Sequence, residues 1–316
     1  MNLLAIPALI ASILMISKGA DWLTDSIWHI SLRKRVSAGM LGMVVAGLMT
    51  TLPEVTVSSM ASALQSGGIS IGNAIGSTIF NILGIVGIIG LIRPLDFDKA
   101  FLRDFGRNAL IAYFAFFILT IIGRKIDAYD SIILFGVLAA SLYYGYRQRY
   151  VGAPSIASPP GSLIRDVSII FLGGVVLGIG SYLLVYASRS IASDLGIPEI
   201  VIGLSLVAVG TSIPELATGI ASTKKGIEEI SIGNILGANI YNVTLVLGCA
   251  ALIGTVMHGQ PLVAEDSTLF FDIPVMIGAT ALLMVLGGKG TVSRRTSILF
   301  LFIYGFYLAV TFSGVL

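Results

Sequence analysis

The sequence predicts an all-α integral membrane protein with ten transmembrane helices, arranged as two inverted-topology repeats of five helices. Three observations predict this class: the composition, the length of the apolar segments, and a motif that occurs twice. Of the 316 residues, 56% are hydrophobic and 11% are charged, and the mean hydropathy is +0.96. Soluble domains carry about 25% charged residues, so this composition suits a chain surrounded by lipid.

Apolar segments of about 20 residues alternate with short polar loops, and a helix of that length crosses a hydrocarbon core of about 30 Å. Helices are required because lipid offers no hydrogen-bond partners to open backbone groups. The first segment has no basic residues ahead of it and no small-residue cleavage site behind it, so we expect it to be retained. The ten expected spans are 3–29, 36–65, 69–92, 103–123, 129–146, 166–190, 196–222, 230–254, 269–288 and 296–315.

Basic residues are distributed unequally among the loops. The loops after the odd-numbered spans contain fourteen Lys and Arg residues, whereas the alternate loops contain three. Because basic loops stay in the cytoplasm, we expect a multi-pass protein of the cell membrane with both termini outside. The segment 151–165, rich in Pro, Ser and Gly, is typical of a linker between a first repeat at 1–150 and a second at 166–316.

Two stretches repeat each other without a gap at a separation of 161 residues. "TTLPE" at 50–54 aligns with "TSIPE" at 211–215, and "ISIGNAIGSTIFN" at 69–81 aligns with "ISIGNILGANIYN" at 230–242. Of the 32 positions from 50 to 81, eleven are identical to their counterparts in 211–242, including Pro, Glu and Asn, which chance similarity between apolar helices rarely matches. Because each half has an odd number of spans, the second copy enters the membrane from the opposite side. Inverted repeats are common in secondary transporters, whose binding sites lie near the midplane.

Each copy places a glutamate directly after a proline, at Glu54 and Glu215. Proline cannot donate a backbone hydrogen bond, so we expect helix breaks at 50–53 and 211–214 that free carbonyl oxygens. Two carboxylates and several carbonyls form an oxygen cage suited to a hard cation such as Ca²⁺. A charge in the membrane costs at least about 2.5 kcal/mol, so the pair needs a cation or protons. The alternative, that each Glu caps a helix or faces a loop, does not explain why the pair occurs twice.

The other polar residues of the repeat have more than one interpretation. Asn81 and Asn242 supply amide oxygens to the cation or make interhelical hydrogen bonds. Asn73 and Asn234 follow a glycine near an expected helix start, so capping is the favoured role. Close helix packing is predicted for the small-xxx-small glycines, Gly72, Gly76, Gly233 and Gly237.

The paired motifs, "TTLPE" with "SIGNAIGSTIFN" and "GTSIPE" with "SIGNILGANIYN", resemble the two alpha-repeats of the cation/Ca²⁺ antiporter superfamily of archaeal and bacterial type. These motifs lie within 42–92 and 203–253. The superfamily includes sodium/calcium and proton/calcium exchangers. The resemblance implies four central ion positions and alternating access by sliding of the first and sixth helices. It implies that Ca²⁺ binds Glu54, Glu215 and backbone carbonyls around Thr50 and Thr211. Further ion positions are implied at the side-chain oxygens of Thr51, Ser77, Asn81 and Ser212.

Two positions depart from the sodium-coupled members, which carry Ser and Asp where this chain has Ala238 and Asn242. Those members also carry the sequence Gly-Thr-Ser before the Leu-Pro-Glu of the first repeat, where this chain has Met49, Thr50 and Thr51. Ala238 offers sodium no side-chain oxygen and Asn242 offers a neutral one, whereas two protons neutralise two carboxylates as well as one Ca²⁺ does. We therefore expect exchange of Ca²⁺ for H⁺, with Na⁺ exchange as the alternative. The GNxxE motif of proton/calcium exchangers is absent, because glycine stands at its last position in both repeats.

Other classes fit the sequence less well. Two glutamates buried in one cage suit an occluded site better than the continuous pore of a channel. An enzyme would need a Ser–His, His–acid or Asp-dyad arrangement that the motifs do not contain. The net charge of +2 is too small to indicate a nucleic-acid ligand, and the single Cys249 permits no intrachain disulfide. We expect no cofactor, with Ca²⁺ as the transported ion and Mn²⁺ as a second candidate. The sequence sets no oligomeric state, and a monomer is compatible with it.

Overall fold

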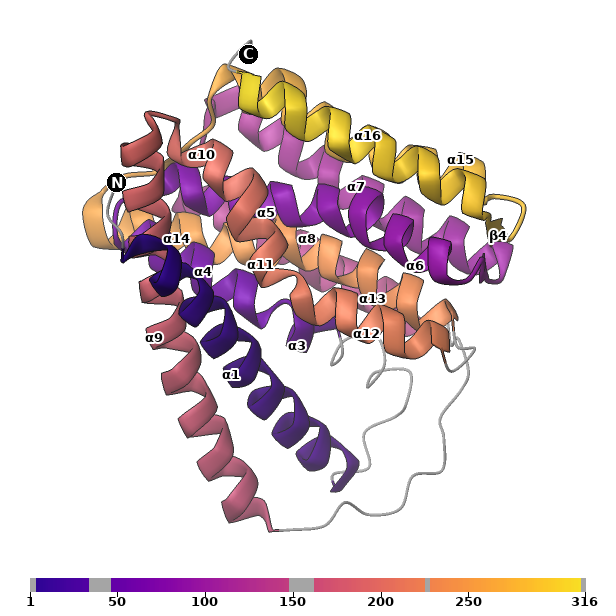
Figure 1. Cartoon of the computed structure of the whole chain (residues 1–316), viewed down its shortest axis with the longest axis horizontal. Helices are drawn as coiled ribbons and strands as arrows, with labels where there is room; N and C mark the ends of the chain where they lie inside the picture. The colour runs from indigo at the N-terminus through magenta and orange to yellow at the C-terminus, as the bar shows by residue number, and fades with distance from the viewer. Residues whose placement is uncertain (1–3, 34–46, 148–161, 225–227, 314–316) are drawn as a thin grey trace.

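The computed structural model describes residues 4–33, 47–147, 162–224 and 228–313, which are almost entirely helical (Figure 1). Most of the expected linker lies outside the described residues, as does the start of the second expected span, 36–46. Within the described residues, eight helices are long and apolar enough to cross a membrane, and a bent pair raises that number to nine. The protein is therefore a helical membrane protein.

The elements follow the expected apolar segments closely, and η denotes a π-helix. The first half contains α1 (Ala5–Arg33), α3 (Gly47–Thr50), α4 (Leu52–Ala63), α5 (Gly67–Ile79), η2 (Phe80–Val86), α6 (Gly87–Ile92), β1 (Leu95–Asp96), α7 (Lys99–Gly123), β2 (Lys125–Ile126) and α8 (Ala128–Arg147). The second half contains α9 (Leu163–Leu195), α10 (Glu199–Ile202), η3 (Gly203–Val207), α11 (Ala208–Thr211), α12 (Ile213–Lys224), α13 (Glu228–Tyr241), η4 (Asn242–Val246), α14 (Leu247–His258), β3 (Leu262–Val263), η5 (Thr268–Asp272), α15 (Ile273–Gly287), β4 (Thr291–Val292) and α16 (Arg294–Ser313).

Both expected helix breaks are confirmed at equivalent residues. In the first half α3 ends at Thr50 and α4 begins at Leu52, so the break falls on Thr51. In the second half it falls on Ser212, where the span bends by 43°. Thr51 and Ser212 have nearly the same backbone angles, φ −84° and −85°. The proline that follows each break by two residues accounts for the interrupted hydrogen-bond ladder.

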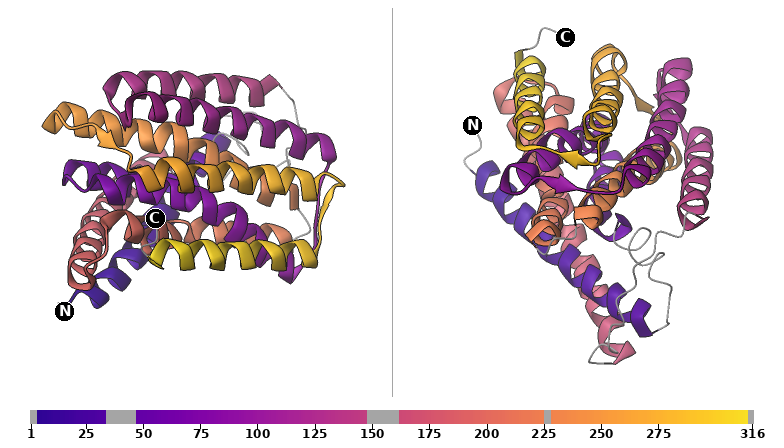
Figure 2. Two further views of the ribbon diagram at one scale, coloured as in Figure 1. Left: turned by 90° about the horizontal axis from the view of Figure 1, so that it is seen from above. Right: turned by 90° about the vertical axis from the view of Figure 1, so that its right-hand side faces the viewer.

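The helices α1 and α9 form a separate packed pair, and they cross the other helices obliquely (Figures 1 and 2). Gly19 of α1 allows this contact, because a Cβ there would lie 2.9 Å from the Gly173 oxygen and the Leu177 nitrogen of α9. Leu9, Ile16, Leu177 and Leu184 belong to an apolar cluster between this pair and α4 that is distinct from the main core. The first and sixth spans thus pack as one unit.

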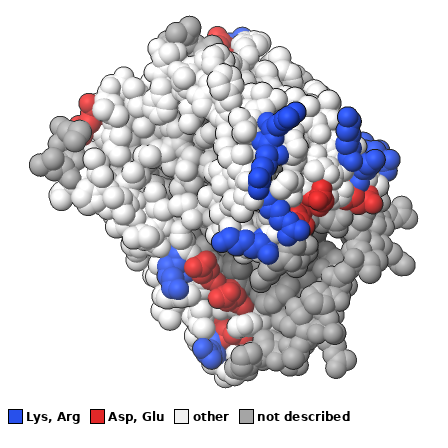
Figure 3. Space-filling model, turned by 45° about the vertical axis from the view of Figure 1, so that its right-hand side comes forward, with Lys and Arg blue, Asp and Glu red and all other residues white. Residues whose placement is uncertain are grey.

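Short antiparallel pairs of strands join the loops at the ends of the bundle. One pair links β1 with β4, and the other links β2 with β3. Each pair joins two loops that the basic-residue count predicts to lie on the same side of the membrane. Lys and Arg side chains gather on the right-hand part of the face drawn in Figure 3.

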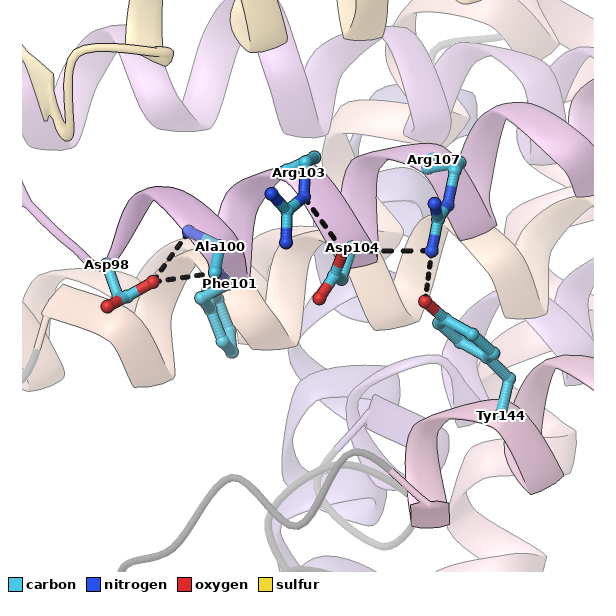
Figure 4. Close-up of polar contacts among 7 residues, drawn as sticks. All are labelled: Asp98, Ala100, Phe101, Arg103, Asp104, Arg107 and Tyr144. Atoms are coloured by element: carbon cyan, nitrogen blue, oxygen red, sulfur yellow. Dashed lines mark hydrogen bonds and ion pairs between the residues drawn. The ribbon is translucent and has the colours of Figure 1, made fainter.

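A row of polar contacts lies along the start of α7 (Figure 4). Asp98 caps the helix, because its Oδ1 accepts hydrogen bonds from the backbone nitrogens of Ala100 and Phe101 at 2.6 and 3.1 Å. Asp104 is 7% exposed and faces two cations, with Arg103 Nε at 3.1 Å and Arg107 Nη2 at 3.7 Å. This buried carboxylate is therefore compensated by charge, as buried carboxylates ordinarily are.

The outward faces of the helices are apolar. Ile122 of α7, Phe171 of α9 and Phe302 of α16 are each more than 70% exposed. Apolar faces of this extent are incompatible with water and fit contact with lipid acyl chains. Polar residues accordingly concentrate inside, where the two broken spans meet.

Candidate cation-binding site

Glu54 and Glu215 lie in the first turns of α4 and α12, directly after the two helix breaks. Both side chains are completely buried. Ser212, three residues before Glu215, contacts the carboxylate of Glu54 at 3.0 Å. The fold therefore brings together the two glutamates that the repeated motif singled out.

The two carboxylates have different hydrogen-bond partners. Ser212 Oγ donates to Glu54 Oε1 at 3.0 Å, and Glu54 Oε2 has no donor among the described residues. Neither carboxylate oxygen of Glu215 has a donor in that part of the chain. The hydroxyl of Thr50 lies near Glu215, yet it bonds to Asn234 Oδ1 at 3.2 Å. Three carboxylate oxygens are thus buried without a donor among the described residues.

Thr50 and Thr211 connect the two halves by equivalent hydrogen bonds. Thr50 Oγ1 donates to Asn234 Oδ1, and Thr211 Oγ1 donates to Asn73 Oδ1 at 2.9 Å. Thr211 is the repeat equivalent of Thr50, and Asn73 is the repeat equivalent of Asn234, at the same separation of 161 residues. Each threonine at a helix break is therefore held by an asparagine of the opposite half.

Asn81 and Asn242 occupy the starts of two π-helices, η2 and η4, and both are buried. Asn81 Nδ2 donates to Asn239 Oδ1 at 2.8 Å, which leaves its own Oδ1 without a donor. Asn242 has no partner among the described residues for either amide atom. The position equivalent to Asn239 is Thr78, whose hydroxyl is used by the carbonyl of Ala74. This substitution explains why Asn242 lacks the bond that Asn81 makes.

Ser77, Thr51 and Ser212 have different surroundings. Ser77 Oγ lies 3.4 Å from Thr211 Oγ1 and 3.3 Å from the carbonyl oxygen of Ala208, so it faces the second break. Thr51 Oγ1 donates to the carbonyl of Gly47 at 2.8 Å, whereas its equivalent, Ser212, donates to a glutamate. The hydroxyl of Thr51 is thus committed to its own helix, and that of Ser212 reaches across the repeat.

The packing of the helices explains how these residues meet. In the described structure α4 packs against η4 and α12 packs against η2, so each glutamate-bearing helix contacts the asparagine-bearing π-helix of the other half. Five buried oxygens have no donor there: Glu54 Oε2, both oxygens of Glu215, Asn81 Oδ1 and Asn242 Oδ1. The described residues place no three His, Cys, Asp or Glu side chains together. Two carboxylates with neutral oxygens fit a hard cation with mixed ligands.

Residues 4–147 and 166–313 match the family model of the sodium/calcium exchanger protein. The chain belongs to this family. The membership confirms the superfamily that the paired motifs resemble.

Relatives of this exchanger-family chain match it over most of its length. The sodium/calcium exchanger MaX1 of Methanosarcina acetivorans is 28% identical, covering 96% of this chain and 97% of MaX1. The inner membrane protein YrbG of Escherichia coli is 32% identical over 79% of this chain and 80% of its own length. A solved structure of the sodium-calcium exchanger NCX_Mj aligns with a TM-score of 0.65 and 28% identity, covering 98% of this chain and 99% of that one.

The exchanger-family fold also corrects one expectation. Asn73 and Asn234 were expected to cap helices, but α5 begins at Gly67 and α13 at Glu228, so both asparagines lie inside helices. They hold Thr211 and Thr50 instead. The prediction that these asparagines cap helices was wrong because the helices begin earlier than the Gly-Asn pairs suggested. A polar residue recurring inside an apolar helix was the available signal for an interhelical contact.

Proposed function

We propose that this protein is a secondary active antiporter that moves Ca²⁺ in exchange for protons by alternating access. The observation that carries the proposal is the set of five buried oxygens without donors around Glu54 and Glu215. Buried polar groups ordinarily have partners, so these atoms are available to a transported ion. The family membership and the similarity to the sodium/calcium exchangers MaX1 and NCX_Mj support Ca²⁺ as that ion.

In this proposal Glu54 and Glu215 bind Ca²⁺ directly, and carbonyls freed at Thr50 and Thr211 complete the cage. The oxygens of Asn81 and Asn242 are further ligands, since both are buried and without donors. Thr51, Ser77 and Ser212 line the remaining ion positions, and Ser212 positions Glu54 through its hydrogen bond. Mn²⁺ is a second candidate substrate because it also accepts oxygen ligands.

We also propose ten transmembrane helices in two inverted halves, 1–150 and 166–316, joined by the linker 151–165, with both termini outside the cell membrane. The equivalent bonds of Thr50 and Thr211 support the repeat, because each crosses between halves. The strand pairs β1–β4 and β2–β3 support the assignment of loops to sides.

Protons are the proposed counter-ion because of charge balance. When Ca²⁺ leaves, two carboxylates remain together in a buried, low-dielectric space, and two protons neutralise them without further ligands. Ala238 and Asn242 add no charge to attract Na⁺. Protons and Ca²⁺ then compete for the same oxygens, so Ca²⁺ binding tightens as the pH rises.

The flux of Ca²⁺ into proteoliposomes tests the counter-ion. With the membrane potential clamped, an acidic interior should drive Ca²⁺ uptake, and a sodium gradient at constant pH should have little effect. Vesicles containing the Glu54→Gln, Glu215→Gln double variant are the control for leak. Uptake that follows sodium and ignores pH would establish the second candidate, Na⁺/Ca²⁺ exchange, which the similarity to the sodium/calcium exchangers MaX1 and NCX_Mj favours. Uptake without either gradient would indicate a channel.

Introducing at positions 238 and 242 the Ser and Asp of the sodium-coupled members should change which ion gradient drives Ca²⁺ uptake. We expect the Ala238→Ser, Asn242→Asp double variant to gain sodium-driven Ca²⁺ uptake, because a hydroxyl and a third carboxylate give Na⁺ ligands that the wild-type chain lacks. The control is Ala250→Ser, a buried position on α14 outside the site. An unchanged ratio of sodium-driven to proton-driven uptake would show that these two positions do not select the counter-ion.

A further inference from the structure

Asp272 is a buried carboxyl group that lies in a membrane span away from the site described above. Asp272 ends the π-helix η5 and is 2% exposed, inside the apolar span Thr268–Gly287. Ionisable residues within membrane spans are rare and mark functional positions. Two other π-helices, η2 and η4, begin next to or at the site asparagines, and π-helical turns are frequent at functional sites.

The surroundings of Asp272 differ from those of the other buried aspartates. Asp104 faces two arginines, and Asp166 lies 3.4 Å from His29. Asp272 Oδ1 accepts a hydrogen bond from the Tyr307 hydroxyl of α16 at 2.9 Å. The other groups that act on it are the Thr268 hydroxyl, one turn earlier, and the carboxyl of Glu265. Tyr304, also on α16, is a titratable neighbour of Tyr307 and not of Asp272 itself. In the described part of the chain no Lys, Arg or His faces this carboxyl group.

We propose that Asp272 is a second proton-binding site in the membrane, separate from Glu54 and Glu215. One carboxyl and two hydroxyl groups are too few for a metal cation, so the ligand is a proton. The proton binds the free carboxylate oxygen, while Tyr307 keeps its own hydrogen and continues to donate it to Oδ1. Glu265 lies near the loop that carries β3, which makes that side of the membrane the source of the proton.

Aromatic contacts connect Asp272 to the π-helix that carries Asn81. The rings of Tyr307 and Tyr304 lie 6.4 Å apart, and Tyr304 lies 5.3 Å from Phe80, the first residue of η2. The helix α16 packs along η2. A change of charge at Asp272 alters the hydrogen bond that holds α16 in this position. Because coupling between two sites is reciprocal, Ca²⁺ binding then alters proton binding at Asp272 by the same factor.

The proton site is tested by infrared titration, which detects the carbonyl stretch of a protonated carboxyl group. The measurement uses the Glu54→Gln, Glu215→Gln double variant, in which the site glutamates cannot titrate, so its result does not depend on the proposed transport function. We expect one buried carboxyl band that titrates, disappears on adding Asp272→Asn, and shifts in position and midpoint on adding Tyr307→Phe. A spectrum that Asp272→Asn leaves unchanged would overturn the proposal.

The coupling is tested in the chain that retains both glutamates. There Ca²⁺ should change the proton affinity of Asp272 about fivefold or more. Asp272→Asn should reduce the pH dependence of Ca²⁺ affinity to the part that Glu54 and Glu215 contribute, while uptake at neutral pH persists. Asp98→Asn, which changes a helix cap at the end of the bundle, is the matched control. If Asp272→Asn leaves the pH dependence identical to that of the wild type, the coupling is absent. This part rests on the proposed antiport, whereas the infrared result stands without it.

Discussion

Replacement of either Glu54 or Glu215 by glutamine should abolish Ca²⁺ transport and leave the protein folded. Glutamine keeps the volume of the side chain but removes half of the negative charge that balances the divalent cation. Loss of an outer partner of a metal ligand already lowers affinity about 10–100-fold, so loss of a direct ligand should lower it by about 100-fold or more. The measurement is Ca²⁺ uptake by proteoliposomes, together with Ca²⁺ affinity by calorimetry on the purified protein.

Glu199→Gln is the matched control, because it makes the same chemical change on α10, where the side chain is partly exposed and pairs with Arg189 at 3.2 Å. Its uptake should equal that of the wild type. Size-exclusion chromatography establishes that all three variants are folded. Wild-type uptake by Glu54→Gln or Glu215→Gln would place the Ca²⁺ site elsewhere in the chain.

Gly72→Ala and Gly76→Ala should each prevent the close approach of α5 to α10 and η3 and destabilise the fold. A Cβ on Gly76 would lie 2.5 Å from the backbone oxygen of Leu204, and one on Gly72 would lie 2.6 Å from that of Ile200. Backbone atoms cannot move aside as a flexible side chain can, so the helices must separate, at a cost of about 3 kcal/mol for each variant. The same contact places Ser77 beside Thr211, so transport should also fall.

The second repeat offers the control for these glycines. Gly233 is equivalent to Gly72, but a Cβ there meets chiefly the ring of Phe101, with its nearest atom at 3.0 Å, and this side chain can shift. We expect Gly233→Ala to stay monodisperse after heating in detergent, as judged by fluorescence-detected size exclusion, under conditions that aggregate both first-repeat variants. Equal heat resistance of all three variants would show that the glycines do not set the helix spacing.

The membrane class, the helical segments among the described residues and the burial of Glu54 and Glu215 were predictable from the sequence. The apolar segments are long because each has to cross the same hydrocarbon thickness, so their boundaries appear directly in the residue order. The breaks at Thr51 and Ser212 were predictable as well, since proline removes a backbone donor wherever it occurs in a helix. The duplication of the Pro-Glu pair indicated that Glu54 and Glu215 act together.

The roles of the asparagines and the difference between the two glutamates were decided only by the tertiary structure. Asn73 holds Thr211, 138 residues away, and no local pattern specifies which helix will lie opposite a polar side chain. Thr51 and Ser212 are equivalent in sequence, yet one bonds to its own helix and the other to Glu54.

Asp272 shows the same limit of sequence reasoning. The residue is visible within an apolar span, but its isolation from every described cation depends on how α15 and α16 pack. The sequence by itself determined which segments enter the membrane and which charges they carry. Tertiary packing decided which of those charges are compensated, because the compensating groups come from helices that are distant along the chain.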